Sequence, residues 1–423
     1  MKKPELLAPA GDMEKLKVAY HFGADAVYIG MKNFSLRANT KNFDEDELFK
    51  AVDYSHKLGK KIYIALNAYV TDDDAEEVIK SLNLINALKP DGVIVSDLGV
   101  LYLAKRYAPD TAIHISTQAN ITNLYSVKQY SLLGARRAIM ARELTLDQIA
   151  YIAKNCDIEI ETFIHGAMCI SYSGRCLLSS YMTNKNLGRR PDDAKTETRS
   201  ANRGDCVHPC RWEYVLRENG RPNQEYPIEQ DEMGSYILSS KDICMINHID
   251  KLIESGITSF KIEGRMKSIL YLSSIIRAYR RAIDSYFDKN LAYDKEQIDY
   301  ELNIVSHREF STGFFFDSPR VKSNQTGNTE YKRDTRLAAL IENVEGDKAN
   351  LKVYNKMTSD AEYEYIGPDM KTVKLGKIIL FDKDGNTVET VNHTDQAAAL
   401  IYDKSGNIIK PEILNILRMK ADF

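Results

Sequence analysis

Short apolar runs rich in β-branched residues alternate with longer amphipathic runs from residue 5 to about residue 285. The short runs are bounded by Gly, Pro and Asp and are typical of buried strands, whereas the longer runs have helical periodicity. The expected strands are 5–8, 26–29, 61–66, 92–95, 112–115, 138–140, 158–164 and 259–262. The longer runs predict helices between them, for example 46–58 and 74–88, and a further helix at 269–286.

Strands that are apolar almost throughout and alternate with helices are typical of a parallel sheet covered on both faces. Eight such units in roughly 280 residues match a (β/α)8 barrel of the TIM type. The alternative is an open doubly wound sheet, but no Gly-x-Gly-x-x-Gly turn follows the first strand. We therefore expect an α/β fold with a (β/α)8 barrel domain over residues 1–290.

An irregular, cysteine-rich stretch at 167–240 separates the seventh expected strand from the eighth. In a barrel, such an insertion leaves the C-terminal end of a strand, where active sites lie. Residues 291–335 are polar and contain turn signals, which predicts a linker. From 336 to 423 short alternating runs are separated by Gly, Asp and Asn turns, which predicts a small C-terminal all-β barrel domain.

The composition adds limits on partners and location. A hydrophobic fraction of 43% suits a globular core, and a net charge of −3 means that an RNA partner would need a local basic surface. The chain has no run of 18 apolar residues, and no apolar h-region of a signal peptide develops after Lys2 and Lys3. We expect no membrane span, no secretory signal and a cytoplasmic protein. Structural disulfides are rare in that reducing environment.

Four of the six cysteines are clustered in the insertion, in the spacings C-x6-C and C-x3-C. They are Cys169, Cys176, Cys206 and Cys210. Four thiolates are the usual ligands of a zinc site or an iron–sulfur cluster. The alternative is that they are small buried hydrophobes, and we favour that interpretation for Cys156 and Cys244.

Polar or charged residues follow nearly every expected strand, where a barrel places them at its active-site face. They include Asn67, Gln118, Arg142, Glu143, His165, Glu263 and Arg265, with Arg37 in the loop after the second strand. The arginine forks suit a carboxylate or phosphate, although neighbouring glutamates could neutralise them. Glu263 and His165 are candidate acid–base residues; His165 could instead be a metal ligand or a hydrogen-bonded core histidine.

Other familiar machinery is missing from the sequence. No His-Glu-x-x-His helix, no recognisable Ser/His/Asp arrangement and no Walker-type loop can be singled out. The slightly basic segment 185–205, with Tyr172, Arg175 and Tyr181 nearby, could stack on or clamp single-stranded nucleic acid. A solvated loop is the alternative.

Several long motifs occur in an order that resembles the collagenase-like peptidase family. They are ELLAPAG at 5–11, GADAVYIG at 23–30, HGAMC at 165–169, YSGRC at 172–176, NRGDC at 202–206, CRW at 210–212 and KIEGRMKS at 261–268. Within that family the sequence is most similar to the branch of prephenate-dependent tRNA uridine hydroxylation proteins. The resemblance implies a [4Fe–4S] cluster held by Cys169, Cys176, Cys206 and Cys210, with Cys244 as a reserve for Cys210 and zinc as the alternative metal. It also implies tRNA and prephenate as partners.

The leading hypothesis is a tRNA-modifying enzyme, or enzyme subunit, that hydroxylates a wobble uridine at C5. Arg37, Arg142 and Arg265 would bind the anionic co-substrate, and Asn67, Gln118, His165 and Glu263 would line the site. One alternative is a metal-dependent collagenase-like peptidase. The other is a zinc-stapled RNA-binding scaffold that presents tRNA to a protein partner.

Overall fold

The structure is a computed structural model of the chain. It describes residues 2–32, 34–35, 42–169, 171–183, 199–212, 215–217, 225–227, 240–316 and 335–420. These residues fall into two compact units. The first comprises the described residues up to 16, 25–266 and 308–316, and the second comprises 17–24, 267–307 and 335–420.

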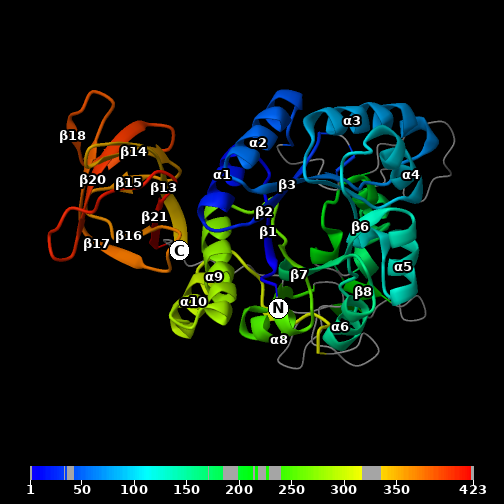
Figure 1. Ribbon diagram of the computed structural model, residues 1–423. Coiled ribbons are helices and arrows are strands. Elements are labelled where there is room, and N and C mark those ends of the chain that lie inside the picture. Colours follow the sequence, from blue (N-terminus) through cyan, green and yellow to red (C-terminus); the bar gives the residue numbers. More distant parts are fainter. Residues whose placement is uncertain are drawn as a thin grey trace. The chain divides into compact units, whose positions relative to one another are not determined.

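Eight parallel strands close into a barrel in the first unit (Figure 1). In chain order they are β1 (Glu5–Pro9), β2 (Ala26–Gly30), β3 (Lys61–Leu66), β4 (Gly92–Val95), β5 (Ile113–Ile115), β6 (Ala135–Ile139), β7 (Glu159–Ala167) and β11 (Ser259–Ile262). Each strand pairs with the one before it in this order, and β11 also pairs with β1, which closes the ring. The predicted (β/α)8 barrel is confirmed, because an open sheet would lack the closing pair.

Helices lie outside the ring of strands (Figure 1). They include α2 (Glu45–Lys57), α3 (Ala75–Leu88), α4 (Leu98–Tyr107), α5 (Leu124–Leu132) and α6 (Leu146–Lys154). A polar side chain caps the start of α2, α4, α5 and α6 by accepting from a backbone N–H. At the start of α2, the Asp44 carboxylate accepts from the Glu47 N–H and the Glu47 carboxylate accepts from the Asp44 N–H. Such a capping box satisfies two backbone donors that the first helical turn leaves unpaired. In the chain, α1 (Met13–His21) follows β1 and α8 (Ile249–Glu254) precedes β11.

Side chains fill the inside of the barrel, so the ring of strands is not a pore. The apolar part of this interior is made by Leu7, Ala26, Tyr28, Tyr63, Ala65, Ile94, Ile139 and Phe163. The near-continuous apolar strands follow from this arrangement, because inward residues meet one another and outward residues meet the helices.

The predicted cysteine-rich insertion after the seventh strand is confirmed. Its described parts are the short 3₁₀ helices η3 (Tyr172–Gly174), η4 (Ala201–Arg203) and η5 (Pro209–Arg211), helix α7 (Leu178–Thr183) and strands β8 (Val215–Arg217) and β9 (Glu225–Pro227). The chain returns through β10 (Asp242–Cys244), which pairs antiparallel with the end of β7 and parallel with β12 (Phe310–Ser311). This pairing brings residues near 308 to the barrel mouth.

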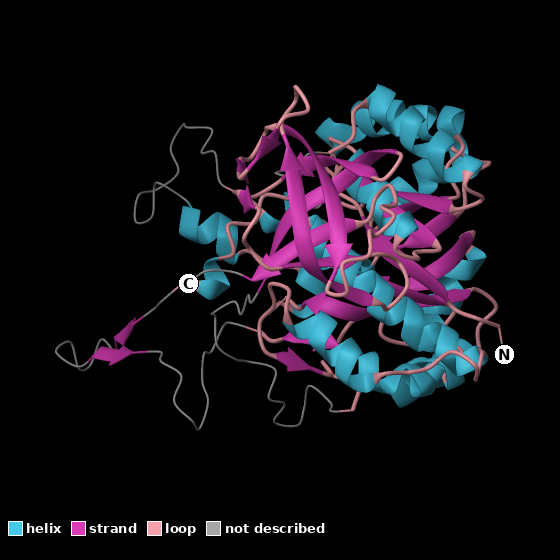
Figure 2. Ribbon diagram, turned by 90° about the vertical axis from the view of Figure 1, so that its left-hand side faces the viewer, coloured by secondary structure: helices cyan, strands magenta, loops and turns pink. Residues whose placement is uncertain are grey.

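The second unit contains α9 (Ile269–Phe287), α10 (Lys295–Asn303) and the predicted all-β barrel, whose strands are magenta in Figure 2. Six antiparallel strands form its ring in the order β16 (Tyr363–Ile366), β21 (Ile416–Lys420), β13 (Thr335–Glu345), β14 (Lys348–Val353), β20 (Gln396–Asp403) and β17 (Thr372–Phe381). A pairing between β16 and β17 closes the ring. β18 (Thr387–Val388) extends β17, and β15 (Met357–Thr358) pairs with β19 (Thr390–Val391).

Helix α10 lies in the segment 291–335 that the sequence predicts to be a linker. Asp294 caps its start by accepting from the Gln297 N–H. Its buried positions are Ile298, Glu301 and Leu302. Because Glu301 is charged, it interrupts the apolar periodicity from which a helix is predicted. Among the described residues, no helix combines the length and apolarity needed to cross a bilayer.

Glu301 is completely buried between two arginines of the second unit. Its Oε1 lies 2.5 Å from Arg277 Nη2 and 2.6 Å from Arg418 Nη2. Arg277 also donates to the Gly367 carbonyl at 3.2 Å, and Arg418 donates to Glu364 at 2.8 Å. These contacts connect α9 and α10 to the β strands of the same unit.

Acid pH is expected to destabilise the second unit through Glu301. Burial alone raises its pKa, but hydrogen bonds and charges of Arg418 and Arg277 lower the pKa of Glu301 from 4.5 to about 2. A carboxyl with a lowered folded-state pKa stabilises the fold above its unfolded pKa and loses that contribution as the pH falls towards its folded pKa. This shift in the pKa of Glu301 corresponds to about 3 kcal/mol of unfolding free energy at neutral pH. Urea unfolding between pH 6 and pH 2 should show this loss in the wild type and not in Glu301→Gln; equal pH dependence of the two proteins would contradict it.

Candidate active site at the barrel mouth

A cavity of about 170 Å³ lies at the C-terminal ends of the barrel strands. Its wall is shared by residues that follow β3, β5, β6, β7 and β11 and by the insertion. Because the strands are parallel, their carboxyl ends meet at one face of the barrel, and the insertion covers that face. The cavity therefore collects side chains that are far apart in the sequence.

All four clustered cysteines line this cavity. Cys169 follows β7, Cys176 precedes α7, and Cys206 and Cys210 lie after η4 and within η5. The segments that carry them are bonded together, since Asn202 Oδ1 accepts from the Cys176 N–H at 3.2 Å. Ser179 likewise connects α7 to the Cys206 segment, because its hydroxyl accepts from the Val207 N–H at 3.2 Å.

Two of these thiols accept hydrogen bonds from the backbone. The Cys176 sulfur accepts from the Leu178 N–H and the Cys206 sulfur from the His208 N–H, each at 3.3 Å. Cysteine sulfur binds metals as the thiolate, and both of these sulfurs line the cavity. This donor chemistry fits a zinc ion or an iron–sulfur cluster.

The four cysteines are chemically suited to bind a metal, but their side chains are not gathered around one point. Within the part of the chain that the structure describes, no three His, Cys, Asp or Glu side chains lie close enough together to hold a metal ion. A shared centre would therefore draw the cysteine loops inward. Cys244 lies in β10 opposite His165 and is not among the described residues of the cavity wall, whereas Cys210 lines that wall.

Arg142 and Arg265 both line the cavity. Arg142 donates to the Ala167 carbonyl at 3.1 Å and lies over the Phe163 ring with its Cζ 4.0 Å from the ring centroid. Its Nε has no hydrogen-bond partner among the described residues. Arg265 is buried, and its guanidinium donates to Ser35 Oγ and to Asn42 Oδ1. Arg37, the third predicted arginine, lies outside the described residues.

Arg265 has room because β2 ends in a glycine. A Cβ atom on Gly30 would overlap the Arg265 guanidinium and the Ser35 hydroxyl. Any side chain at this position would have to displace the arginine from its partners.

The predicted polar residues Asn67, Gln118 and Glu263 also line the cavity. Asn67 Nδ2 donates to Ser116 Oγ at 3.3 Å, and the Gln118 carbonyl accepts from Arg175 Nε at 3.2 Å. Glu263 Oε2 accepts from the Tyr28 hydroxyl at 3.3 Å. The strand-end rule thus finds residues that the fold brings to one wall.

His165 is not among the described residues of this wall. Phe163 pairs with Lys261, but His165 pairs with Ile262, so β7 has a bulge at this point. A bulge re-aims the side chains that follow it, because strand side chains alternate between faces. His165 is 1% exposed, and its ring centroid lies 5.5 Å from that of Phe310. This placement favours the core-histidine alternative; its carbonyl accepts from the Glu263 N–H at 2.8 Å.

Two further cations on the wall were not predicted from the sequence, Lys261 and Arg308. Lys261 lies within β11, where one charged residue in an apolar strand is the available signal. Arg308 lies beyond α10 in the chain, and its guanidinium is held by Asp242 Oδ1 at 2.7 and 2.9 Å. With Arg142 and Arg265, the wall has four cations and two carboxylates, Glu143 and Glu263. Lys261 and Arg308 are paired with the buried carboxylates Glu161 and Asp242, so the wall offers cationic N–H donors to an anion but no net excess of charge.

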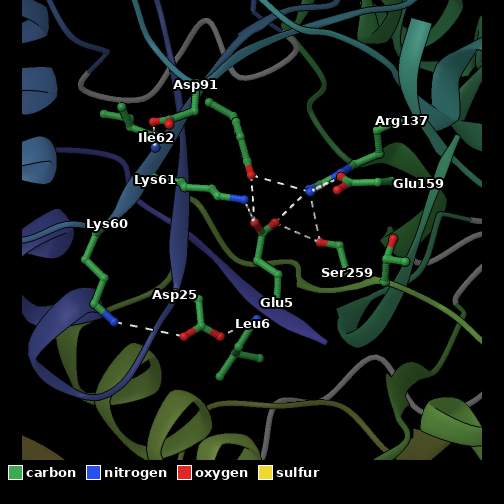
Figure 3. A network of polar contacts seen from close by, with 12 residues as sticks. Glu5, Leu6, Asp25, Lys60, Lys61, Ile62, Asp91, Arg137, Glu159 and Ser259 are labelled. Carbon is green, nitrogen blue, oxygen red and sulfur yellow. Dashed lines mark hydrogen bonds and ion pairs between the residues drawn. The ribbon is translucent and has the colours of Figure 1, made fainter. Parts of the chain in front are cut away.

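A buried charged network fills the opposite, N-terminal end of the barrel. Arg137 donates to Glu5 at 2.7 Å, to Glu159 at 2.6 Å and to Glu161 at 2.9 Å. Figure 3 shows Glu5 facing Arg137, Ser259 and Lys61. Although burial raises the pKa of Glu5, the charge and hydrogen bond of Arg137 lower it overall.

This network also affects the neighbouring histidine of β5. Burial, with the charges of Arg137 and Lys261, lowers the pKa of His114 well below its usual value. His114 is therefore uncharged at neutral pH and adds no positive charge to the barrel interior.

Comparison with known proteins places the chain in a family. Peptidase family U32 matches residues 11–325. The chain is 36% identical over 407 residues to tRNA hydroxylation protein P1 of Bacillus subtilis, covering 95% of this chain and 93% of that protein. It is 32% identical over 418 residues to tRNA hydroxylation protein P of Escherichia coli, covering 87% of each. It is also 36% identical over 330 residues to the 23S rRNA 5-hydroxycytidine C2501 synthase of Escherichia coli, covering 77% of this chain and 45% of that protein. The match to the family covers most of the chain, and the protein is a member of peptidase family U32.

Proposed function

We propose that this protein is an enzyme, or the subunit of an enzyme, that hydroxylates a tRNA uridine at C5. Two relatives whose names state tRNA hydroxylation match it over 87% or more of the chain. A third relative is named for 5-hydroxycytidine in ribosomal RNA, a product with a hydroxyl group on the same pyrimidine carbon, and this supports the proposed position. The observation that carries the proposal is that one cavity is lined by both four cysteines and four cationic side chains.

Replacing the C5 hydrogen of uracil by a hydroxyl group is a two-electron oxidation, so it needs an acceptor for two electrons and a donor for the oxygen atom. We assign Cys169, Cys176, Cys206 and Cys210 as ligands of a [4Fe–4S] cluster, which supplies one-electron transfer when bound. Glu263 is suited to hold the proton that leaves C5, because one of its oxygens already accepts from Tyr28. Its backbone is fixed by the His165 carbonyl.

We assign to the arginines the role of binding the anionic co-substrate. Prephenate, the co-substrate proposed here, carries two carboxylates, and guanidinium forks bind carboxylates through paired N–H donors. Arg142 and Arg265 line the cavity and are anchored by Ala167, Ser35 and Asn42. Fixed donors of this kind lose little freedom when the ligand binds. Asn67 and Gln118 add neutral hydrogen-bonding groups to the same wall.

A uridine can reach this cavity from a single-stranded loop of tRNA, where its base can be turned out of the stack. Tyr172 and Tyr181 in the insertion are 52% and 60% exposed and provide rings on which neighbouring bases can stack. Residues 184–198, which hold much of the basic segment of the insertion, lie outside the described residues. We place the reaction in the cytoplasm and assign to a protein partner the role of accepting the electrons that leave the substrate.

The two alternatives make different predictions. A metal-dependent peptidase, the activity in the family's name, would hydrolyse protein substrates and lose that activity to a chelator. A zinc-stapled scaffold would bind tRNA without changing it and would be colourless. The cations and thiols that line the cavity suit the first proposal.

Nucleoside analysis of tRNA tests the proposed function. The gene is expressed in a bacterial host from which the tRNA uridine hydroxylation genes have been removed, and digested tRNA is analysed by mass spectrometry. We expect 5-hydroxyuridine derivatives to appear with the wild-type protein and not with an empty vector. Unmodified tRNA in a host that supplies prephenate and an iron–sulfur assembly system would contradict the proposal.

A further inference from the structure

Lys261 is a buried cation of strand β11 that lines the cavity. It is 4% exposed, and its Nζ donates to Glu161 Oε1 at 2.9 Å. An ammonium group has three N–H donors, and Glu161 is its hydrogen-bond acceptor among the described residues. The Nζ atom also lies 4.4 Å from the centroid of the Tyr28 ring and 5.4 Å from that of Phe163. Donors therefore remain for a ligand in the cavity.

Glu161 fixes the position of this ammonium. It is completely buried, and its other oxygen, Oε2, accepts from Arg137 at 2.9 Å and from Ser259 at 3.2 Å. Arg137 is held in turn by Glu5 and Glu159. A buried carboxylate with this many donors has little freedom to move, because breaking any one contact leaves a charge or donor without compensation.

The surroundings of Lys261 distinguish a binding role from charge neutralisation alone. Two cations lie over the Phe163 ring. Lys261 Nζ is 5.4 Å and Arg142 Cζ is 4.0 Å from the ring centroid. Both cations line the cavity, so one aromatic side chain presents two positive charges to the same space. Lys261 lies inside the strand, whereas Arg142 and Arg265 follow their strands, which places Lys261 deeper in the barrel.

We propose that Lys261 Nζ is the innermost anion-binding group of the cavity and that Glu161 is its positioning residue. The ligand class is a small molecule with two carboxylates, one contacting Lys261 and the other contacting the arginines nearer the mouth. The inference rests on the proposed function in taking the anionic co-substrate as this ligand. An ammonium engaged with a carboxylate has no free lone pair, so the assigned role is binding and not nucleophilic attack.

Calorimetric titration of the purified full-length protein with prephenate, and separately with malonate as a simple dicarboxylate, tests the proposal. Lys261→Met is expected to weaken prephenate binding about ten- to hundred-fold, the loss typical of a hydrogen bond between charged groups. Lys261→Arg keeps the charge and should weaken binding by less than Lys261→Met. The matched control is Lys61→Met, since Lys61 pairs with Glu5 at 3.4 Å in the same network but is 54% exposed and is not among the described residues of the cavity wall.

A second variant protects the test against misfolding. Lys261→Met alone leaves Glu161 with one cation fewer, so the double variant Lys261→Met/Glu161→Gln removes both members of the pair. Thermal unfolding shows which variants are folded. A folded variant without Lys261 that binds prephenate as tightly as the wild type overturns the proposal, as does equal weakening by Lys61→Met.

Failure of this proposal can be separated from failure of the proposed function. Lysine-dependent prephenate binding by a protein that leaves tRNA unmodified would uphold the anion site and remove the tRNA activity. A wild-type protein that modifies tRNA but binds neither probe at millimolar concentration would remove the anion site and uphold the activity.

Discussion

The variant Cys206→Ser is expected to lower the 5-hydroxyuridine content of tRNA at least about tenfold. Cys206 lines the cavity with three other cysteines, and its sulfur accepts a backbone hydrogen bond from His208. Losing an outer partner of a metal ligand typically costs 10- to 100-fold in affinity or activity, so losing a ligand itself should cost no less. Mass spectrometry of tRNA nucleosides from cells expressing each variant measures the effect.

Cys156→Ser is the matched control for this variant. The Cys156 thiol donates to the Ile158 carbonyl at 3.4 Å, and burial raises its pKa, which disfavours the thiolate. It is not among the described residues that line the cavity, so its replacement should leave modification within twofold of the wild type. Cys210→Ser should resemble Cys206→Ser, and Cys244→Ser should resemble the control. Unchanged modification in Cys206→Ser would contradict the assigned ligands.

The variant Arg137→Met should destabilise the barrel by about 3–5 kcal/mol, the cost of removing one partner of a buried ion pair. Arg137 is 2% exposed and bonds carboxylates that are 0%, 11% and 44% exposed. Without it, Glu161 would keep Lys261 as its single ion-pair partner among the described residues, and Glu5 would depend on the half-exposed Lys61. Urea unfolding at pH 7 measures the change.

The neighbouring Arg136 provides the comparison for this prediction. It lies on the same strand β6 but is exposed, so Arg136→Met removes the same charge and the same side-chain length from a solvated position. Exposed substitutions of this kind typically change stability by less than about 0.5 kcal/mol. Equal destabilisation by the two variants would show that the buried network contributes nothing specific.

The sequence predicts the barrel well because each strand is buried on both faces. The least accurate strand is β6, expected at 138–140 and found at Ala135–Ile139. Arg136 and Arg137 lie at the start of this strand. A buried arginine interrupts the apolar run from which a strand is predicted. The sequence does not predict helix α10 for the same reason: the charged residue Glu301 occupies a buried position, where an apolar residue would be expected. Both errors come from charges whose partners lie far away in the chain.

The site is predictable where it follows from strand ends alone. Asn67, Gln118, Arg142, Glu263 and Arg265 reach the cavity because parallel strands end at one face. The direction of the His165 side chain depends on a bulge at Ile164, because a shift of one residue changes the face of every side chain that follows. Arg308 depends on the pairing of β12 with β10, which joins segments that no local pattern relates.

The iron and acid-labile sulfide content of protein purified without oxygen tests whether the four cysteines hold a cluster. We expect about four iron and four sulfide per chain, a brown protein, and loss of both in Cys206→Ser but not in Cys156→Ser. A colourless wild-type protein, stoichiometric zinc, or an iron content unaffected by Cys206→Ser would contradict this expectation.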